Sequence, residues 1–193
     1  MVKNVPLNNR FDIFELPLKD LKIIQRKSIA DHRGYLERFF CKKELDKLID
    51  GKSIEQINYT MTALRGTVRG MHFQTTPYTE MKFVSCLRGE IFDVAIDLRV
   101  GSPTFLLYHA EILSEQNKKT FVIPEGFAHG FQTLTKKCEI LYFHTGIYQP
   151  ESDCGLNPFD PMLAIKWPLA VSKISDRDIN HPMLTQSFNG VAV

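Results

Sequence analysis

The sequence lacks the features that mark membrane-spanning, secreted and zinc-binding proteins. No apolar run approaches the roughly 18 residues of a transmembrane helix, and residues Met1–Pro6 lack the apolar core of a signal peptide. Only four cysteines occur, widely spaced, and none forms a Cys-Xaa-Xaa-Cys pair of the kind that binds zinc or cycles redox state. We therefore expect a cytoplasmic protein with reduced thiols and no membrane partner.

The sequence also has little excess charge. Its 24 Lys and Arg residues against 22 Asp and Glu give a net charge of +2, and no basic patch is present to bind nucleic acid. No internal repeat, low-complexity tract or Ser/Gly-rich linker divides the chain. A hydrophobic content of 44% is that of an ordinary globular protein, so we expect a single domain over residues 1–193.

Short alternating runs separated by Gly, Pro and Asn predict a mainly β protein. The clearest pair is Lys82–Leu87 and Glu90–Leu98, joined by a turn at Arg88-Gly89; in the second run, Asp93, Ala95 and Asp97 share the face opposite the larger apolar residues. Further strands are expected at Leu21–Lys27, Tyr35–Phe40, Ile54–Thr62, Thr67–Gln74, Phe105–Leu113, Lys119–Ile123, His129–Thr133 and Ile140–Ile147. One helix is expected at Lys42–Ile49 and a second near the carboxyl terminus. This number of strands indicates a sandwich, jelly roll or barrel.

Two histidines stand in segments that could carry chemistry. In Gly66–Gln74, alternation places Arg69 with Met71 and Phe73 on one face, and His72 with Gln74 on the other. If the second face lines a closed barrel, its polar groups are costly to bury unless they bind something. In Ile123–Gln132, Pro and Gly shape a turn that delivers His129 onto the next strand. A lone histidine is more often structural, so the segments alone leave both roles open.

The second segment resembles a motif of the cupin superfamily, Pro-Xaa-Gly-Xaa-Xaa-His, and the first lies where cupins carry His-Xaa-His. Metal-binding cupins combine such histidines with a carboxylate. This sequence has Gln74 at the second ligand position, and the nearest carboxylate, Glu80, shares its face with Lys82, whose charge would repel a cation. We therefore favour a pocket for a sugar or organic acid, with no metal and no cofactor.

A longer ordered set of motifs resembles the dTDP-4-dehydrorhamnose 3,5-epimerase family. The set runs from about Arg33 to Asp178 and comprises Arg33-Gly34, Gln56-Ile57-Asn58, Arg69–Gln74, Lys82, Asp93–Arg99, Ser102–Phe105, Phe127–Phe131, Tyr142, Tyr148-Gln149-Pro150 and Asp160-Pro161. The resemblance implies an all-β cupin double-stranded β-helix (jelly roll) with short peripheral helices. It also implies a homodimer that inverts C3, C5 or both in a nucleotide-linked 4-keto-6-deoxyhexose.

The resemblance assigns catalytic roles to three residues. His72 would be the base, because an imidazole with a pKa near 6.5 suits proton abstraction near neutral pH. Asp178 would orient that imidazole, although by sequence alone it would be interpreted as a surface turn residue. Tyr142 would return a proton from the opposite face of the sugar, although a buried core tyrosine is the commoner role.

Further residues are implied to bind the substrate. Lys82 would stabilise the oxyanion that forms on the keto oxygen. Guanidinium groups match phosphate oxygens, which suits Arg33 and Arg69 to the diphosphate. The nucleotide would contact Gln56 and Asn58. His129 would hydrogen-bond the sugar, and Tyr148 would stack on the sugar or on the base. Three further binding positions depart from the residues usual in the family: Arg38, Asp153 and Arg177.

These departures favour a branch with a different nucleotide sugar or with a single epimerised centre. Three alternatives stay open from the sequence. One is a metal-dependent cupin oxygenase or isomerase that uses His72 and His129 as ligands, another is a 3,4-ketoisomerase on the same fold, and the third is a catalytically silent sugar-binding cupin.

Overall fold

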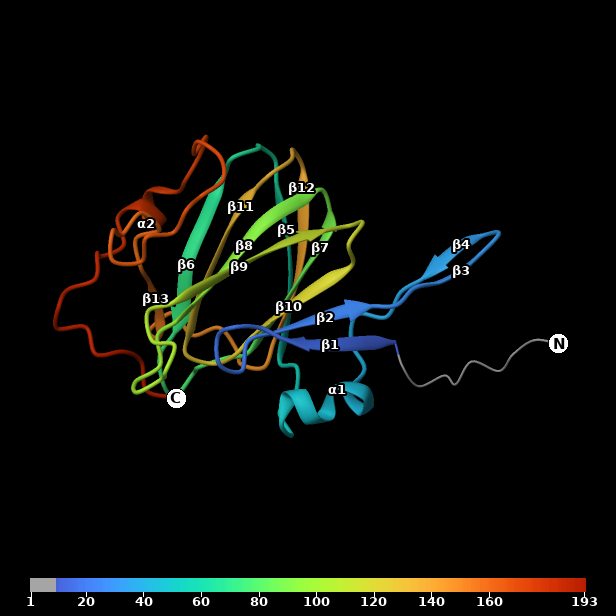
Figure 1. Ribbon diagram of the computed structural model, residues 1–193, viewed down its shortest axis with the longest axis horizontal. Helices are drawn as coiled ribbons and strands as arrows, with labels where there is room; N and C mark the ends of the chain where they lie inside the picture. The colour runs from blue at the N-terminus through green and yellow to red at the C-terminus, as the bar shows by residue number, and fades with distance from the viewer. Residues whose placement is uncertain (1–9) are drawn as a thin grey trace.

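Two antiparallel sheets stacked face to face form the body of the molecule (Figure 1). The structure is a computed structural model that describes residues 10–193, so the segment Met1–Pro6 discussed above lies outside the described residues. The first sheet has the strand order β1 (Phe11–Glu15), β2 (Lys22–Arg26), β10 (Lys119–Ile123), β7 (Lys82–Arg88), β12 (Cys138–His144), β5 (Gln56–Thr62). The second has the order β13 (Asp153–Gly155), β6 (Val68–Gln74), β11 (Phe127–Thr133), β8 (Glu90–Asp97), β9 (Tyr108–Ser114).

Three smaller elements complete the fold. A separate hairpin is formed by β3 (Ile29–Asp31) and β4 (Gly34–Leu36). The helices are α1 (Lys42–Ile49) and the single-turn α2 (Asp176–Ile179). Among the described residues, no helix is long and apolar enough to cross a membrane. The cysteines Cys41, Cys86, Cys138 and Cys154 are free thiols, as expected.

The predicted elements are confirmed in their positions, with corrections at several ends. Helix α1 and strand β10 have the predicted bounds. The strand predicted at Tyr35–Phe40 is wrong beyond Leu36, where β4 ends. The strand predicted from Phe105 starts only at Tyr108, because the hydroxyls of Ser102 and Thr104 bond to Asp97 and hold the preceding residues in a turn. The strand predicted to Ile147 ends at His144.

The interior between the two sheets is apolar at one end. Both sheets contribute its buried side chains: Val84, Cys86, Ile91, Ala95, Leu113, Phe121, Ile123, Phe127, Phe131, Cys138 and Ile140. Strand β8 alternates as predicted, but its larger residues, Val94 and Ile96, point away from this interior. Asp93 and Ala95 therefore face inward, and Asp93 is completely buried.

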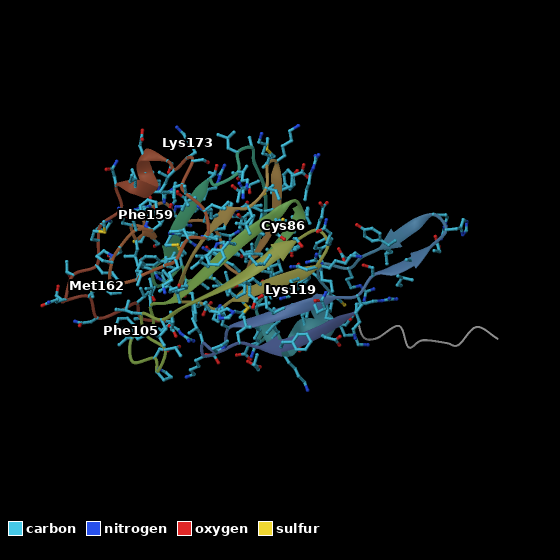
Figure 2. All side chains as sticks on the ribbon, turned by 45° about the horizontal axis from the view of Figure 1, so that its top comes forward. Cys86, Phe105, Lys119, Phe159, Met162 and Lys173 are labelled. Carbon is cyan, nitrogen blue, oxygen red and sulfur yellow. The ribbon has the colours of Figure 1, made fainter. Side chains whose placement is uncertain are left out.

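Each outer face of the sandwich is covered in part, and Ile57, Tyr59 and Met61 of β5 stay exposed. Helix α1 buries Leu45 and Ile49 completely against Phe83, Val122 and Phe143 of the first sheet. Burying one such side chain contributes roughly 1.5–3 kcal/mol. The carboxyl-terminal segment covers the second sheet, and Figure 2 places its labelled residues Phe159 and Met162 at the side of the molecule away from the β3–β4 hairpin.

The β3–β4 hairpin projects from the body of the molecule into solvent (Figure 1). Its apolar side chains Ile29, Tyr35 and Leu36 are 44%, 65% and 62% exposed. A two-stranded hairpin with little packing of its own is marginally stable in water. Among the residues that the structure describes, the Lys118 ammonium lies 4.2 Å from the Tyr35 ring centroid, and much of the surface of these side chains stays uncovered.

Candidate active site

A cavity of about 220 Å³ opens between the two sheets, next to the apolar interior. The first sheet contributes one wall, formed by Asn58, Thr60, Lys82, Tyr142 and His144. The second sheet contributes the facing wall, formed by Arg69, His72, His129, Gly130 and Phe131. Polar side chains on both walls of a partly open cavity favour a ligand that is held from both sides.

A register shift in β6 brings Arg69 and His72 to the same cavity. Simple alternation puts these two residues on opposite faces, and that expectation is wrong. Against β11, His72 pairs with His129 and Arg69 pairs with Phe131, so β6 spans one residue more than its partner in this interval. Such a bulge turns the following side chain to the other face.

Gly70 permits the close approach of β6 and β11 at this bulge. Its φ of +122° is in the region that favours glycine, and a Cβ there would lie 2.5 Å from Gly130 Cα. Gly130 in turn leaves room for Met71 Sδ, which would lie 2.5 Å from its Cβ. The two glycines thus set the spacing between the strands that carry His72 and His129.

His72 is held by Asp178, a residue far away in sequence. Its Nε2–H donates to Asp178 Oδ1 over 2.8 Å, and the backbone N–H of Gly70 donates to the second carboxylate oxygen. Burial raises the pKa of Asp178, but the hydrogen bond and charge of His72 outweigh it and leave that pKa below its usual value. The ionised carboxylate fixes the imidazole tautomer, so Nδ1 is the ring nitrogen left to accept a proton.

Asp178 is not the surface turn residue that its sequence context suggests. It is 4% exposed, and its backbone N–H donates to the Ser175 hydroxyl that caps α2. The cap and the Gly70 hydrogen bond together fix the position of the carboxylate below His72.

Tyr142 faces His72 from the opposite sheet. Burial raises the pKa of its phenol well above the usual value, and the negative charge of Asp93 adds to the shift. The phenol is therefore fully protonated at neutral pH. Its ring lies 6.2 Å from the His129 ring and 6.0 Å from the His144 ring, centroid to centroid.

Lys82 and His144 share a buried carboxylate. Glu80 Oε2 accepts from His144 Nδ1 over 2.7 Å, and Glu80 Oε1 lies 3.4 Å from Lys82 Nζ. Burial raises the pKa of Glu80, but the His144 hydrogen bond and the Lys82 charge lower it below its usual value. The three groups place a buried cation and an oriented imidazole on the Tyr142 side of the cavity.

His129 also has a buried carboxylate partner. Its Nε2 lies 2.6 Å from Asp93 Oδ1, and the two side chains are 7% and 0% exposed. Burial raises the pKa of Asp93, and the nearby His129 and Lys82 oppose this shift. A shared hydrogen bond between these groups keeps His129 oriented at the cavity wall.

Three of the predicted binding residues form a cluster on the surface. Asp153 Oδ2 accepts from the Tyr148 hydroxyl over 2.9 Å and from Arg177 Nη2 over 2.6 Å. Gln56 holds the same loop, because its side-chain oxygen accepts from the Tyr148 backbone N–H. Asp153 pairs with Gln74 on β6, two residues beyond His72, so the cluster lies along the strand that carries His72.

Two predicted binding residues lie away from the cavity of their own chain. Arg33 lies between β3 and β4, in the turn of the hairpin, and is bonded to Asp31, with a shortest distance of 2.6 Å. Arg38 pairs with Glu44 of α1. Neither lines the cavity.

The metal-ligand set of a metal-binding cupin does not fit these residues. The Gln74 amide donates to the carbonyls of Tyr78 and Ile147, and its oxygen accepts from Gln149 N–H, so it holds loops together. Glu80 is already paired with His144 and Lys82. The residues expected to join His72 and His129 on an ion are thus engaged elsewhere.

Comparisons with known proteins agree with this fold. Residues 15–186 match the family model described as dTDP-4-dehydrorhamnose 3,5-epimerase. A dTDP-6-deoxy-D-glucose-3,5-epimerase from Legionella pneumophila, solved in complex with dTDP-4-keto-L-rhamnose, superposes with a TM-score of 0.85 at 39% identity, covering 90% of this chain and 92% of that one. The jelly-roll fold and these matches define an epimerase with the cupin fold.

Two similar proteins show to which family of epimerases the chain belongs. The dTDP-4-dehydrorhamnose 3,5-epimerase of Sinorhizobium fredii is 39% identical over 182 residues, or 92% of this chain and 93% of that protein. The chain belongs to the dTDP-4-dehydrorhamnose 3,5-epimerase family. A dTDP-4-dehydrorhamnose 3-epimerase of Streptomyces niveus is also similar, at 34% identity over 82% of this chain and 76% of that protein.

Sequence reasoning missed three residues of the cavity and its support. His144 lies two residues after Tyr142 on one strand, so alternation would have placed it on the same wall. Thr60 has the same relation to Asn58. Asp93 gave a weaker signal, an acidic residue in an otherwise apolar run, and its pairing with His129 needed the register of β8 and β11.

Proposed function

We propose that this protein epimerises a dTDP-linked 4-keto-6-deoxyhexose at C3, C5 or both, without a cofactor. The observation that carries the proposal is the placement of His72 and Tyr142 on facing sheets around one cavity. Inversion at a carbon requires a base on one face of the ring and a proton donor on the other. The named substrates of the similar proteins support the choice of nucleotide and sugar.

In the proposed reaction, His72 takes the proton from a carbon next to the C4 ketone. The electron pair of the broken C–H bond moves into an enolate, whose oxygen bears the negative charge. Asp178 stabilises the imidazolium that forms. Lys82 is 8% exposed, so its positive charge acts at low effective dielectric, where it stabilises the enolate oxygen strongly.

Tyr142 then gives its phenolic proton to the opposite face of the same carbon. The high pKa of this buried phenol keeps it protonated until the carbanion forms. The resulting phenolate regains a proton from solvent and His72 loses one to solvent, so the net reaction is an isomerisation. Positioned acid–base catalysis of this kind contributes about 10²–10⁴-fold.

The remaining predicted residues would bind the substrate. Arg69 and Asn58 line the cavity, Arg69 suiting the diphosphate and Asn58 the nucleotide. His129, oriented by Asp93, would hydrogen-bond the sugar. Tyr148, Asp153 and Arg177 would contact the substrate from the surface cluster, and Gln56 would act there through the Tyr148 loop. Arg38 pairs with Glu44 and does not line the cavity of its own chain, so any contact that it makes with substrate would lie outside that cavity.

A homodimer is part of this proposal. The projecting hairpin exposes Ile29, Tyr35 and Leu36, which a second copy of the chain would cover. Arg33, in the turn between β3 and β4, would then bind the diphosphate in the partner's cavity. A single domain and a cytoplasmic location, both expected from the sequence, also belong to the proposal.

Deuterium incorporation tests the reaction directly. The protein is incubated in D₂O with dTDP-, CDP-, UDP- and GDP-linked 4-keto-6-deoxyhexoses, and mass spectrometry follows label at C3 and C5. Label from the dTDP sugar, with inverted stereochemistry at the labelled carbon, is the expected result. Absence of label from all four nucleotide sugars would overturn the proposal.

A further inference from the structure

One group of side chains, which includes the proposed base His72 and its partner Asp178, has the composition of a metal site. His72, Asp178 and His181 each offer one ligand atom, and these three atoms lie within 4.8 Å of one another. Asp178 Oδ1 is 2.8 Å from His72 Nε2 and 4.0 Å from His181 Nε2. Ligands bound to one ion at about 2.0–2.2 Å lie roughly 3–4 Å apart. Small side-chain shifts would therefore bring all three atoms onto one ion.

His181 supplies an independent indication of a ligand. Its Nε2 is buried and has no hydrogen-bond partner among the residues that the structure describes. Leaving a buried polar atom unpaired costs about 1–3 kcal/mol. An ion bound next to Asp178 would give this nitrogen the partner that it lacks.

Packing holds the His181 ring in place. The ring fills the space that a side chain at position 155 would occupy, because a Cβ on Gly155 would lie only 2.2 Å from His181 Nε2. Gly155 pairs with His72 in the sheet. The Ser175 hydroxyl caps the helical turn that ends just before His181. Packing thus leaves the three ligand atoms only small movements to make when an ion binds, which lowers the entropic cost of binding.

The donor set and its surroundings suit a divalent transition-metal ion. Two imidazoles and one carboxylate are typical ligands of Zn²⁺, Fe²⁺ and Co²⁺. The His72 side chain is 34% exposed and that of His181 is 14% exposed, so the group is within reach of solvent. The nearby Arg177 is paired with Asp153 at 2.6 Å, which reduces its repulsion of a cation.

We propose that His72, Asp178 and His181 bind a divalent transition-metal ion, and that the bound ion inhibits the enzyme. A neutral imidazole has one lone pair. When the ion takes the lone pair of His72 Nε2, the ring proton moves to Nδ1, and His72 has no lone pair left for the substrate proton. The inhibitory part of this inference rests on the proposed function, whereas the binding part does not.

Metal titration tests the site without reference to activity. Untagged, metal-free protein is titrated with Zn²⁺ by calorimetry and with Co²⁺ by visible spectroscopy. His181→Asn removes one ligand, and His109→Asn is the matched control, because His109 forms an imidazole–carboxylate pair with Glu111 elsewhere. We expect one ion per chain in the wild type and the control, and at least about tenfold weaker binding in H181N.

Equal affinity in H181N and wild type, or no saturable binding in the wild type, would overturn the site. His181→Gln is the second variant if melting curves show that H181N is unfolded. Inhibition is then measured by the deuterium assay in chelator-treated buffer. We expect Zn²⁺ to stop the wild type and H109N, chelator to restore them, and H181N to need about tenfold more Zn²⁺.

The binding assay and the deuterium assay together distinguish a failure of the metal proposal from a failure of the proposed function. Saturable binding without inhibition would overturn the inhibitory part. Intact Zn²⁺ binding together with no turnover of any nucleotide sugar in the metal-free protein would contradict the proposed function and would still support the three ligands.

Discussion

Asp178 and His72 are 106 residues apart in the chain and are joined by a hydrogen bond of 2.8 Å. The carboxylate comes from a single helical turn and the imidazole from a strand inside the sandwich. Their contact is therefore a product of the whole fold and is absent from any local segment. A substitution that changes only the Asp178 side-chain oxygen therefore tests this one contact.

Asp178→Asn should lower kcat by about 10²–10⁴-fold, because the neutral amide does not stabilise an imidazolium on His72. Initial rates of deuterium incorporation measure the effect. Asp176→Asn is the control, since this residue lies in the same helical turn and its side chain is exposed. Equal losses in both variants would show that the helix end, and not the Asp178 carboxylate, matters.

Tyr142→Phe should separate proton removal from inversion. His72 remains able to take the proton, so solvent deuterium should still enter the substrate with retained configuration, while the yield of inverted sugar falls by orders of magnitude. Mass spectrometry gives the label and NMR gives the configuration. Tyr59→Phe is the control, because Tyr59 is 56% exposed on the neighbouring strand. Full inversion by Y142F would remove the donor role.

The sequence predicts those parts of the site that depend on residues close together in the chain. His144 follows from strand alternation, and α1 follows from its apolar stripe, because both patterns are local. The bulge that turns Arg69 into the cavity depends on two glycines of different strands. Short strands such as β13 are fixed by pairing with β6 and carry no alternating pattern of their own. Asp178 was found only through the family resemblance.

Mixing two impaired variants tests whether the hairpin serves a partner. His72→Gln lacks the proposed base, and Arg33→Ala lacks the proposed diphosphate contact. If Arg33 acts across the dimer, a mixed dimer contains one cavity with both residues intact, so co-expression should restore activity well above either variant alone. Pairing R33A with the double variant R33A/H72Q provides no Arg33 and should show no gain. An absence of gain in the first mixture as well would place Arg33 outside the partner's site.

Asp97 should make the folded state sensitive to acid. It is completely buried and anchors the turn before β9 by accepting hydrogen bonds from Ser102 and Thr104. Although burial raises the pKa of Asp97, the hydrogen bonds from Arg99 and the two hydroxyls lower it to about 2.

Since the folded-state pKa lies below the unfolded value of about 3.9, this group stabilises the protein fully above pH 4 and loses that effect as the pH falls toward 2. At about 1.36 kcal/mol per pKa unit, the shift corresponds to a contribution of about 2 kcal/mol. Urea unfolding at pH 6 and pH 3 should show a smaller loss of stability on acidification in Asp97→Asn than in the wild type. Glu15→Gln is the control, because this carboxylate is largely exposed. Identical losses in wild type and D97N would show that other carboxylates dominate acid unfolding.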